Sequence, residues 1–216
     1  FGTVEASGDD FRDRASVVDL QAFPTRDLQM PGVEAELLQD RGVDVGYVMP
    51  VLDGMRAEGR PFRGFLYVGL MLTDEGPKVI EFNVRFGDPE AQVVLPMLAD
   101  DLLPLVTAAA AGRLGGLRAR LRDEPRVGVV LASGGYPDRY RTGLAISGLD
   151  EADRLPDVLV FHSGTARQDS QVVTAGGRVL TVVGTGEGYR EAIDCAYGAA
   201  ARISFDGLHK RSDIAR

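Results

Sequence analysis

The stretch that most constrains the fold is Lys78–Glu90, which reads KVIEFNVRFGDPE. Successive residues of a β-strand point to opposite faces of the sheet. A strand here places four apolar side chains on one face, namely Ile80, Phe82, Val84 and Phe86. The opposite face then carries a carboxylate, an amide and a guanidinium, those of Glu81, Asn83 and Arg85. We expect the apolar face to pack into a core.

The polar face of this strand has two readings. Hard oxygen ligands suit Mg²⁺, and the forked guanidinium of arginine suits phosphate, so the row fits a site that holds both. The alternative is an ordinary solvated face, which antiparallel strands often have. We favour the site because the row lacks Ser, Thr and Lys, and because the run 65–72 (FLYVGLML) indicates a buried strand just upstream.

The turn between these two strands, residues 73–77, is short enough to predict an antiparallel hairpin. After Gly87, the sequence Asp-Pro-Glu is typical of a helix start, with Asp88 as the N-cap and Pro89 in the first helical position. Glu90 adds an acid to the first turn. Capping is the ordinary role for Asp88, but the backbone N–H groups of a helix start also suit a substrate carboxylate or phosphate.

Two helices are predicted between residues 89 and 111, because prolines at 96 and 104 interrupt the pattern. The second helix begins after Asp100 or Asp101 and ends at Gly112. The glycine- and charge-rich stretch 112–125 then reads as a domain boundary.

Short strands dominate beyond that boundary. The predicted elements are strands at 126–132 and 158–161, a hairpin of 171–174 with 178–183, and a last helix at 189–203 with Ile193, Ala196, Tyr197 and Ala200 on one face. The pair Gly134-Gly135 lacks the Lys-Ser/Thr of a P-loop, so we interpret it as a turn. His162 stands alone at a strand end, which favours a hydrogen-bonded structural role over a metal ligand.

Charge and cysteine content exclude several classes of partner. The formal net charge of −8 argues against nucleic acid and anionic membranes, which both require a basic face. No apolar run is long enough to span a bilayer, and no signal segment precedes the first predicted element. The single cysteine, Cys195, cannot form an internal disulfide, which fits a reducing cytosol. Its alanine-rich surroundings favour buried packing.

The longest motifs resemble the phosphoribosylamine–glycine ligases, ATP-grasp enzymes of purine synthesis. They are GRPFRGFLYVGLML, GPKVIEFNVRFGDPEAQVVLPML, RVGVVLASGGYP, FHSGTA, GGRVL and FDGLHKRSDI. The resemblance covers roughly residues 49–214 and implies an α+β fold. We expect a partial ATP-grasp domain (an antiparallel sheet with helices) at 45–115 and a small mixed α/β C-terminal domain at 126–216. Residues 1–44 lack periodicity and the family pattern, so we leave them unassigned and expect them to pack poorly.

The resemblance also implies roles for individual residues. Glu81 and Asn83 correspond to the family's metal ligands, for Mg²⁺ or Mn²⁺, and Arg85 would assist phosphoryl transfer. Substrate contacts would come from Asp88, Glu90 and His162. The implied substrates are ATP, glycine and phosphoribosylamine. At the expense of ATP, glycine would be joined to phosphoribosylamine through glycyl phosphate, and the implied location is the cytoplasm.

The N-terminal half of such an enzyme is missing from the resemblance. We therefore expect this chain alone to be inactive. Two alternatives stay open at this point: another ATP-grasp carboxylate–amine ligase, and a non-catalytic fragment that serves in binding or assembly.

Overall fold

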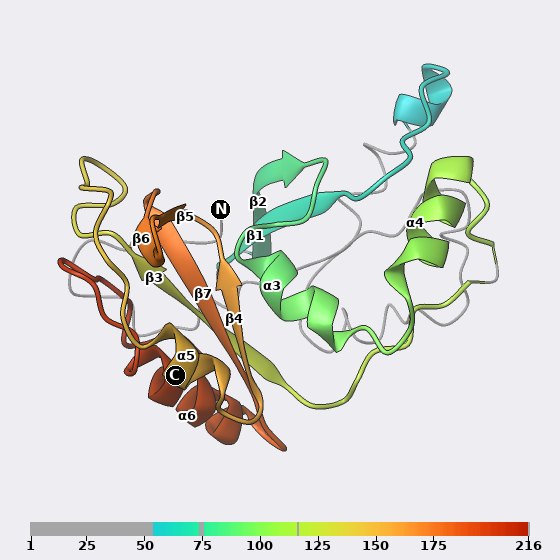
Figure 1. Cartoon of the computed structure of the whole chain (residues 1–216). Helices are drawn as coiled ribbons and strands as arrows, with labels where there is room; N and C mark the ends of the chain where they lie inside the picture. The colour runs from blue at the N-terminus through green and yellow to red at the C-terminus, as the bar shows by residue number, and fades with distance from the viewer. Residues whose placement is uncertain (1–53, 74–75, 116, 216) are drawn as a thin grey trace. The chain divides into compact units, whose positions relative to one another are not determined.

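The computed structural model describes residues 54–73, 76–115 and 117–215 (Figure 1). The expectation for residues 1–44 lies outside these. The chain forms two compact units, which we call the N-terminal and C-terminal units. The first contains the residues up to Asp88 together with Asp100–Arg120, and the second contains Pro89–Ala99 together with Leu121–Arg216. The segment Pro89–Ala99 thus belongs to the same unit as the C-terminal strands, although the stretch 112–125 separates it from them in sequence. The division into domains at 45–115 and 126–216 stays a prediction.

The N-terminal unit contains the predicted hairpin. Strand β1 (Tyr67–Thr73) pairs antiparallel with β2 (Gly76–Asn83). Helix α4 (Leu102–Ala111) begins as predicted, because the Asp101 side chain accepts a hydrogen bond from the Leu103 backbone N–H at 3.0 Å. It ends at Gly112, whose left-handed backbone (φ 65°) closes the last turn. Residues 54–57 are helical.

The apolar face of β2 differs from its prediction. Ile80, Phe82 and Val84 are 52%, 41% and 73% exposed, so the expectation that they face a core is wrong. The upstream prediction of a buried strand is confirmed where side chains are described, at Tyr67 and Val68. Alternation in the sequence shows which side chains share a face of the sheet. It does not show whether another layer of structure covers that face. Among the described residues this sheet has two strands, and no other helix or strand of that part packs closely on it.

The C-terminal unit is built on a three-stranded antiparallel sheet. Its order is β3 (Arg126–Ala132), β7 (Arg178–Thr185), β4 (Val158–His162). The central strand β7 is buried along nearly its whole length. Each of the three strands was predicted to within two residues of its observed ends.

The predicted hairpin between 171–174 and 178–183 is wrong. Strand β6 (Gln171–Thr174) pairs instead with β5 (Thr165–Gln168), and β7 lies between β3 and β4. The residues of β5 (TARQ) show no alternation, so no pattern in them predicts a strand. Asp169, with φ 54°, makes the tight turn that joins β5 to β6.

Helices cover both faces of this sheet. Figure 1 shows α5 (Leu149–Asp153) and α6 (Tyr189–Ala200) along one face. The core there is formed by small residues of α6 against strand residues, namely Ala192, Ala196, Ala199 and Ala200 with Val129, Leu131, Leu180 and Val182. On the other face, α3 (Glu90–Val94) lies over β3, where a Cβ added at Gly128 would be 2.7 Å from Val93 Cγ2. A 3₁₀ turn, η2 (Leu95–Met97), follows α3.

At Gly184 of β7, the backbones of α6 and the sheet approach each other closely. An added Cβ would lie 2.9 Å from Ala196 Cα, with the Ala196 nitrogen and the Ala192 carbonyl oxygen closer still. The alanine face of α6 and this glycine together allow helix and strand backbones to meet. The predicted stripe on α6 is confirmed at Ala196 and Ala200, with Ile193 and Tyr197 packed at its edge.

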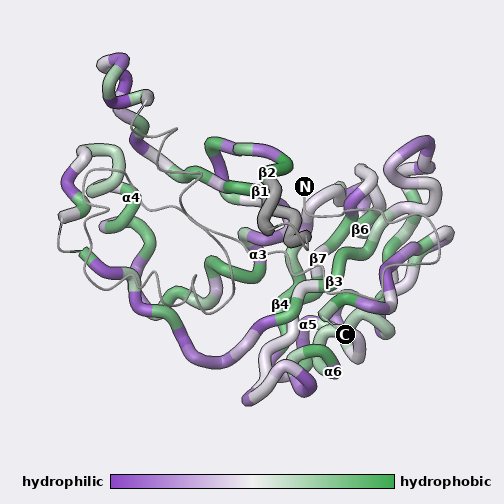
Figure 2. Tube along the Cα trace, turned by 180° about the vertical axis from the view of Figure 1, so that it is seen from behind, coloured by the Kyte–Doolittle hydropathy of each residue, from purple (hydrophilic) through white to green (hydrophobic). Residues whose placement is uncertain are grey.

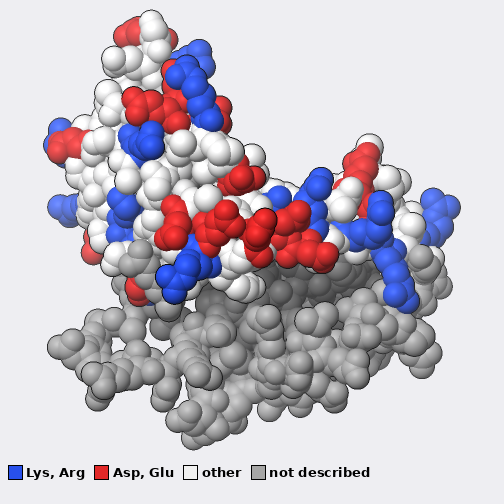
Figure 3. Space-filling view, turned by 90° about the horizontal axis from the view of Figure 1, so that it is seen from below, with Lys and Arg blue, Asp and Glu red and all other residues white. Residues whose placement is uncertain are grey.

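Figures 2 and 3 show the hydropathy of the chain and the charge on one of its faces. Figure 2 shows α4 as largely hydrophobic and the connector that leads from it to β3 as hydrophilic. On the face in Figure 3, acidic side chains lie beside one another with basic side chains among them, over the part of the surface that is described. None of the described helices has the length and hydropathy that crossing a bilayer requires.

Candidate metal site

The ladder of the β1–β2 hairpin brings the two predicted metal ligands onto one face. Glu81 lies opposite Gly69, and Asn83 lies opposite Tyr67. The register shifts just before Glu81, because Leu70 pairs with Val79 and leaves Ile80 without a ladder partner. This is a β-bulge, a feature that redirects the side chains next to it.

Glu81 and Asn83 contact each other directly. The Asn83 Nδ2 donates a hydrogen bond to Glu81 Oε1 at 2.9 Å, and both side chains are half-buried. A carboxylate and an amide oxygen are ligands that Mg²⁺ and Mn²⁺ accept, and Mg²⁺ takes few protein ligands and keeps water or phosphate for the rest. In the observed orientation the amide nitrogen, not the amide oxygen, faces the carboxylate. Binding one cation through both residues would require the Asn83 amide to turn over and exchange this hydrogen bond for a metal bond.

The described residues do not form a complete metal site by themselves. Among them, no group of three or more His, Cys, Asp or Glu side chains is arranged to hold an ion. The donor set at Glu81 and Asn83 therefore fits a metal that is completed by phosphate oxygens and water, as Mg²⁺ in nucleotide sites usually is.

Arg85 does not continue the row on the strand. Strand β2 ends at Asn83, three residues earlier than the alternation through Phe86 predicts. The exposed Arg85 guanidinium donates through Nη1 to the Phe86 carbonyl oxygen at 2.9 Å. The Phe86 ring packs on Phe65 with centroids 4.0 Å apart, which holds the chain just past the strand. The role of Arg85 in phosphoryl transfer stays a prediction.

The two acids near the start of α3 fall in different units. The prediction that Asp88 caps this helix is wrong, because the N-cap position is Pro89 and no side chain caps the helix. The tight turn at 88–89 places the helix start one residue later than the Asp-Pro-Glu pattern indicates. Both Asp88 and Glu90 are half-buried. Their contact with substrate is untested.

His162 lies in the C-terminal unit, at the end of β4. Its Nδ1 and the Thr165 Oγ1 are 2.9 Å apart, and the ring is exposed. This is the hydrogen-bonded role that a lone histidine predicts, and the bond orients the ring. A contact with substrate stays a prediction.

The glycine motifs of the C-terminal unit converge near His162, which the sequence alone did not predict. The Ser133 backbone N–H donates to the Gly177 carbonyl oxygen at 2.8 Å, and the Ser133 hydroxyl donates to that of Gly176 at 2.9 Å. The Ala175 N–H donates to the Gly164 carbonyl oxygen at 2.7 Å. The motifs SGGYP, FHSGT and AGGRVL thus meet at one end of the sheet. The Gly134-Gly135 pair forms a turn, as interpreted from sequence, closed by the Tyr136 N–H on the Ser133 carbonyl oxygen at 3.0 Å.

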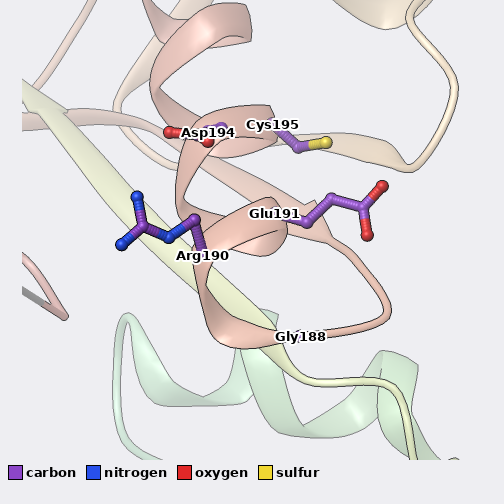
Figure 4. Close-up of a pocket in the computed structure, with 5 residues that line it drawn as sticks. All are labelled: Gly188, Arg190, Glu191, Asp194 and Cys195. Carbon is purple, nitrogen blue, oxygen red and sulfur yellow. The ribbon is translucent and has the colours of Figure 1, made fainter.

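An open pocket of about 540 Å³ lies elsewhere, at the N-terminal end of α6 (Figure 4). Its lining includes none of the predicted site residues; it is formed by Gly188, Arg190, Glu191, Asp194 and Cys195. Burial, together with the carboxylates of Glu191, Asp157 and Asp194, raises the pKa of the Cys195 thiol. The thiol therefore stays protonated at neutral pH and is a poor nucleophile.

Comparisons with known proteins agree on one family. The description "Phosphoribosylglycinamide synthetase, C domain" matches residues 126–216, and the description "Phosphoribosylglycinamide synthetase, ATP-grasp (A) domain" matches residues 30–91. A phosphoribosylamine–glycine ligase of Streptomyces coelicolor is 48% identical over 189 residues, and one of Caldanaerobacter subterraneus is 42% identical over 185. Each alignment covers 86% of this chain.

A solved structure gives the same result. The crystal structure of phosphoribosylamine–glycine ligase from Thermotoga maritima matches with a TM-score of 0.60 and 41% identity. That match covers 75% of this chain but 39% of the Thermotoga chain. The chain likewise spans 43% and 45% of the lengths of the two relatives above, which is less than half of a complete enzyme.

Proposed function

The chain belongs to the phosphoribosylglycinamide synthetase family, and on that premise we propose that it carries the C-terminal part of a ligase that joins glycine to 5-phosphoribosylamine. The name shared by its relatives supports this reaction and its substrates. The product would be glycinamide ribonucleotide, with ATP as co-substrate. The observation that carries the proposal is the Glu81–Asn83 pair on one face of β2, with its 2.9 Å hydrogen bond.

The reaction would proceed in two displacements. A glycine carboxylate oxygen attacks the γ-phosphorus of ATP, the bond from that phosphorus to the bridging oxygen breaks, and ADP leaves. The amine of phosphoribosylamine then attacks the carbonyl carbon of glycyl phosphate. Inorganic phosphate departs and the amine loses a proton. Catalysis of such a phosphoryl transfer depends mainly on positioning and on charge stabilisation.

The residues of the chain would divide this work. Glu81 and Asn83 would hold Mg²⁺ or Mn²⁺, which when bound supplies charge neutralisation at the phosphate oxygens. Arg85 is exposed beside this pair in sequence, and its forked guanidinium suits the phosphoryl group that is transferred. The carboxylates of Asp88 and Glu90 suit the amino groups of the two substrates, and His162 is exposed for a polar contact.

Complementation in trans tests the proposal. The purified chain would be mixed with the separately expressed N-terminal half of the Streptomyces coelicolor relative. ADP release that depends on both glycine and phosphoribosylamine is the expected result for the mixture, and no release is expected from the chain alone. A mixture that forms a stable complex and still releases no ADP would refute the ligase assignment. Robust turnover by the isolated chain would refute the requirement for the other half.

Two substitutions examine the metal pair within the same assay. Glu81→Gln should abolish turnover, since an amide cannot replace the negative charge at the metal. Asn83→Leu should reduce it less, because one carboxylate ligand remains. Glu58→Gln is the matched control, since Glu58 is an exposed acid of the same unit, and it should leave turnover unchanged.

We also place this reaction in the cytosol. The single cysteine cannot form an internal disulfide, which is compatible with a reducing compartment. The predicted partners are small molecules and the missing half of the enzyme.

A further inference from the structure

Gly69 occupies the ladder position directly opposite Glu81. Its neighbour two residues earlier, Tyr67, lies opposite Asn83 and is 2% exposed. Side chains of directly opposed residues in an antiparallel pair share a face and contact each other. On β1, the residues opposite Glu81 and Asn83 are therefore one glycine, which has no side chain, and one tyrosine with a buried ring.

Space, not backbone conformation, explains a glycine at position 69. Positive φ angles occur at seven described glycines, and Gly69 is not among them, so its backbone accepts any L-residue. A Cβ at this position would lie 3.3 Å from Glu81 Cγ and 3.6 Å from Tyr67 Cε1. The Glu81 side chain therefore fills the volume that a side chain at position 69 would need. Glycine inside a strand costs stability and often marks such a close approach.

The β-bulge acts on the same side chain. Ile80 adds one residue to β2 immediately before Glu81, which changes the direction in which Glu81 leaves the strand. The bulge and the bare Gly69 backbone together let Glu81 lie over β1. In that position its Oε1 accepts the hydrogen bond from Asn83.

We propose that Gly69 is a positioning residue of the metal site. Because Gly69 has no side chain, Glu81 can occupy the space over β1 in which it meets Asn83. The inference rests on the proposed function for the role of the metal. The contact between Gly69, Glu81 and Asn83 is testable without it. Adding one methyl group at position 69 should displace Glu81 by a few tenths of an ångström and weaken its hydrogen bond to Asn83.

The sequence offers a specific probe of this contact. Asn83 is the single asparagine of the chain, so selective ¹⁵N-asparagine labelling yields one side-chain amide pair in an NMR spectrum. Gly69→Ala should shift this pair. The control is Gly54→Ala, at a glycine with nothing within 4 Å of its added Cβ and no positive φ, and it should leave the pair in place. An unchanged amide pair in Gly69→Ala would overturn the proposal.

A double variant separates positioning from general damage to the strand. In Glu81→Ala, which removes Cγ, adding Gly69→Ala should produce no further shift. If Gly69→Ala alone fails to fold, the double variant should fold, because the clashing atom is gone. Failure of both to fold, or an equal shift in both backgrounds, would overturn the role.

Titration with Mn²⁺ alone connects the contact to metal binding. The paramagnetic ion should broaden the Asn83 amide pair of the wild-type chain, and excess Mg²⁺ should restore it. Gly69→Ala should need about tenfold more Mn²⁺ for the same broadening, a loss typical of groups that orient metal ligands. Equal broadening in Gly69→Ala and wild type would overturn the positioning role. No selective broadening in wild type would instead refute the metal site of the proposed function, while the amide shift still decides the contact.

Discussion

Replacing Gly184 by alanine tests the packing of the C-terminal unit most directly. The added Cβ would lie 2.9 Å from Ala196 Cα, whereas carbon atoms prefer separations of about 3.5–4.0 Å. Helix α6 must therefore retreat by up to about 1 Å. The obstructing atoms belong to the helix backbone, so no change of rotamer relieves the overlap.

The cost follows from that retreat. Overfilling a packed core typically costs about 1–3 kcal/mol, and a clash with backbone belongs at the upper end. We expect Gly184→Ala to lower the free energy of unfolding by about 3 kcal/mol. Ala192 and Ala196 would lose contact with Val129 and Val182 as the helix moves away.

A second glycine on the same helix provides the control. Gly198 is exposed, and an added Cβ meets nothing within 4 Å. Gly198→Ala should therefore stabilise by up to about 1 kcal/mol, since alanine favours the helix. One methyl group should thus act with opposite sign at two positions.

Urea unfolding followed by far-UV circular dichroism measures both variants. At a denaturant dependence of about 2 kcal/mol per molar, Gly184→Ala should shift the midpoint down by about 1.5 M. A Gly184→Ala midpoint within error of wild type would refute the close approach of α6 to β7. A loss of stability in Gly198→Ala would refute the solvent-facing position of that residue.

Three further predictions concern charged and titratable groups. Hydrogen bonds from Arg120 hold the pKa of Asp100 below its ordinary value. The pair therefore stabilises the fold at pH values above the ordinary pKa of an aspartate, and this stabilisation is lost as the pH falls through the lowered pKa of Asp100 in the folded chain. Asp100→Asn should therefore lower the thermal midpoint at pH 7, and this loss should shrink as the pH falls below the ordinary pKa of an aspartate. Arg126→Met should raise stability by about 1 kcal/mol in urea titrations, because Nε and Nη1 of Arg126 are buried without a hydrogen-bond partner among the described residues. Cys195 should react with a thiol reagent at pH 7 more slowly in the folded chain than in urea, since its pKa is raised mainly by burial.

The sequence allowed correct predictions for features that residues close together in the chain determine. Asp101 and Gly112 delimit α4 because a cap and a left-handed glycine act within one turn of the chain. The close pairing of Glu81 with Asn83 follows from strand alternation in the same way. Such features depend on neighbours in sequence, which are visible without the fold.

Features that depend on distant partners were not predictable. The polar strand β5 exists because β6 pairs with it, and nothing in TARQ announces a strand. The exposure of Val84 depends on which layers surround the hairpin, and alternation carries no information about them. The bulge at Ile80 is a property of the register with β1, so the sequence of β2 did not reveal it.

The membership of Pro89–Ala99 in the C-terminal unit has a consequence for limited proteolysis. The chain passes between the two units three times: after Asp88, after Ala99 and after Arg120. A single protease cut in the connector before β3 therefore leaves α3 on the amino-terminal fragment. Helix α3 still packs over Gly128, which lies on the carboxyl-terminal fragment. The nicked protein should run as two bands under denaturing conditions and elute as one species under native ones.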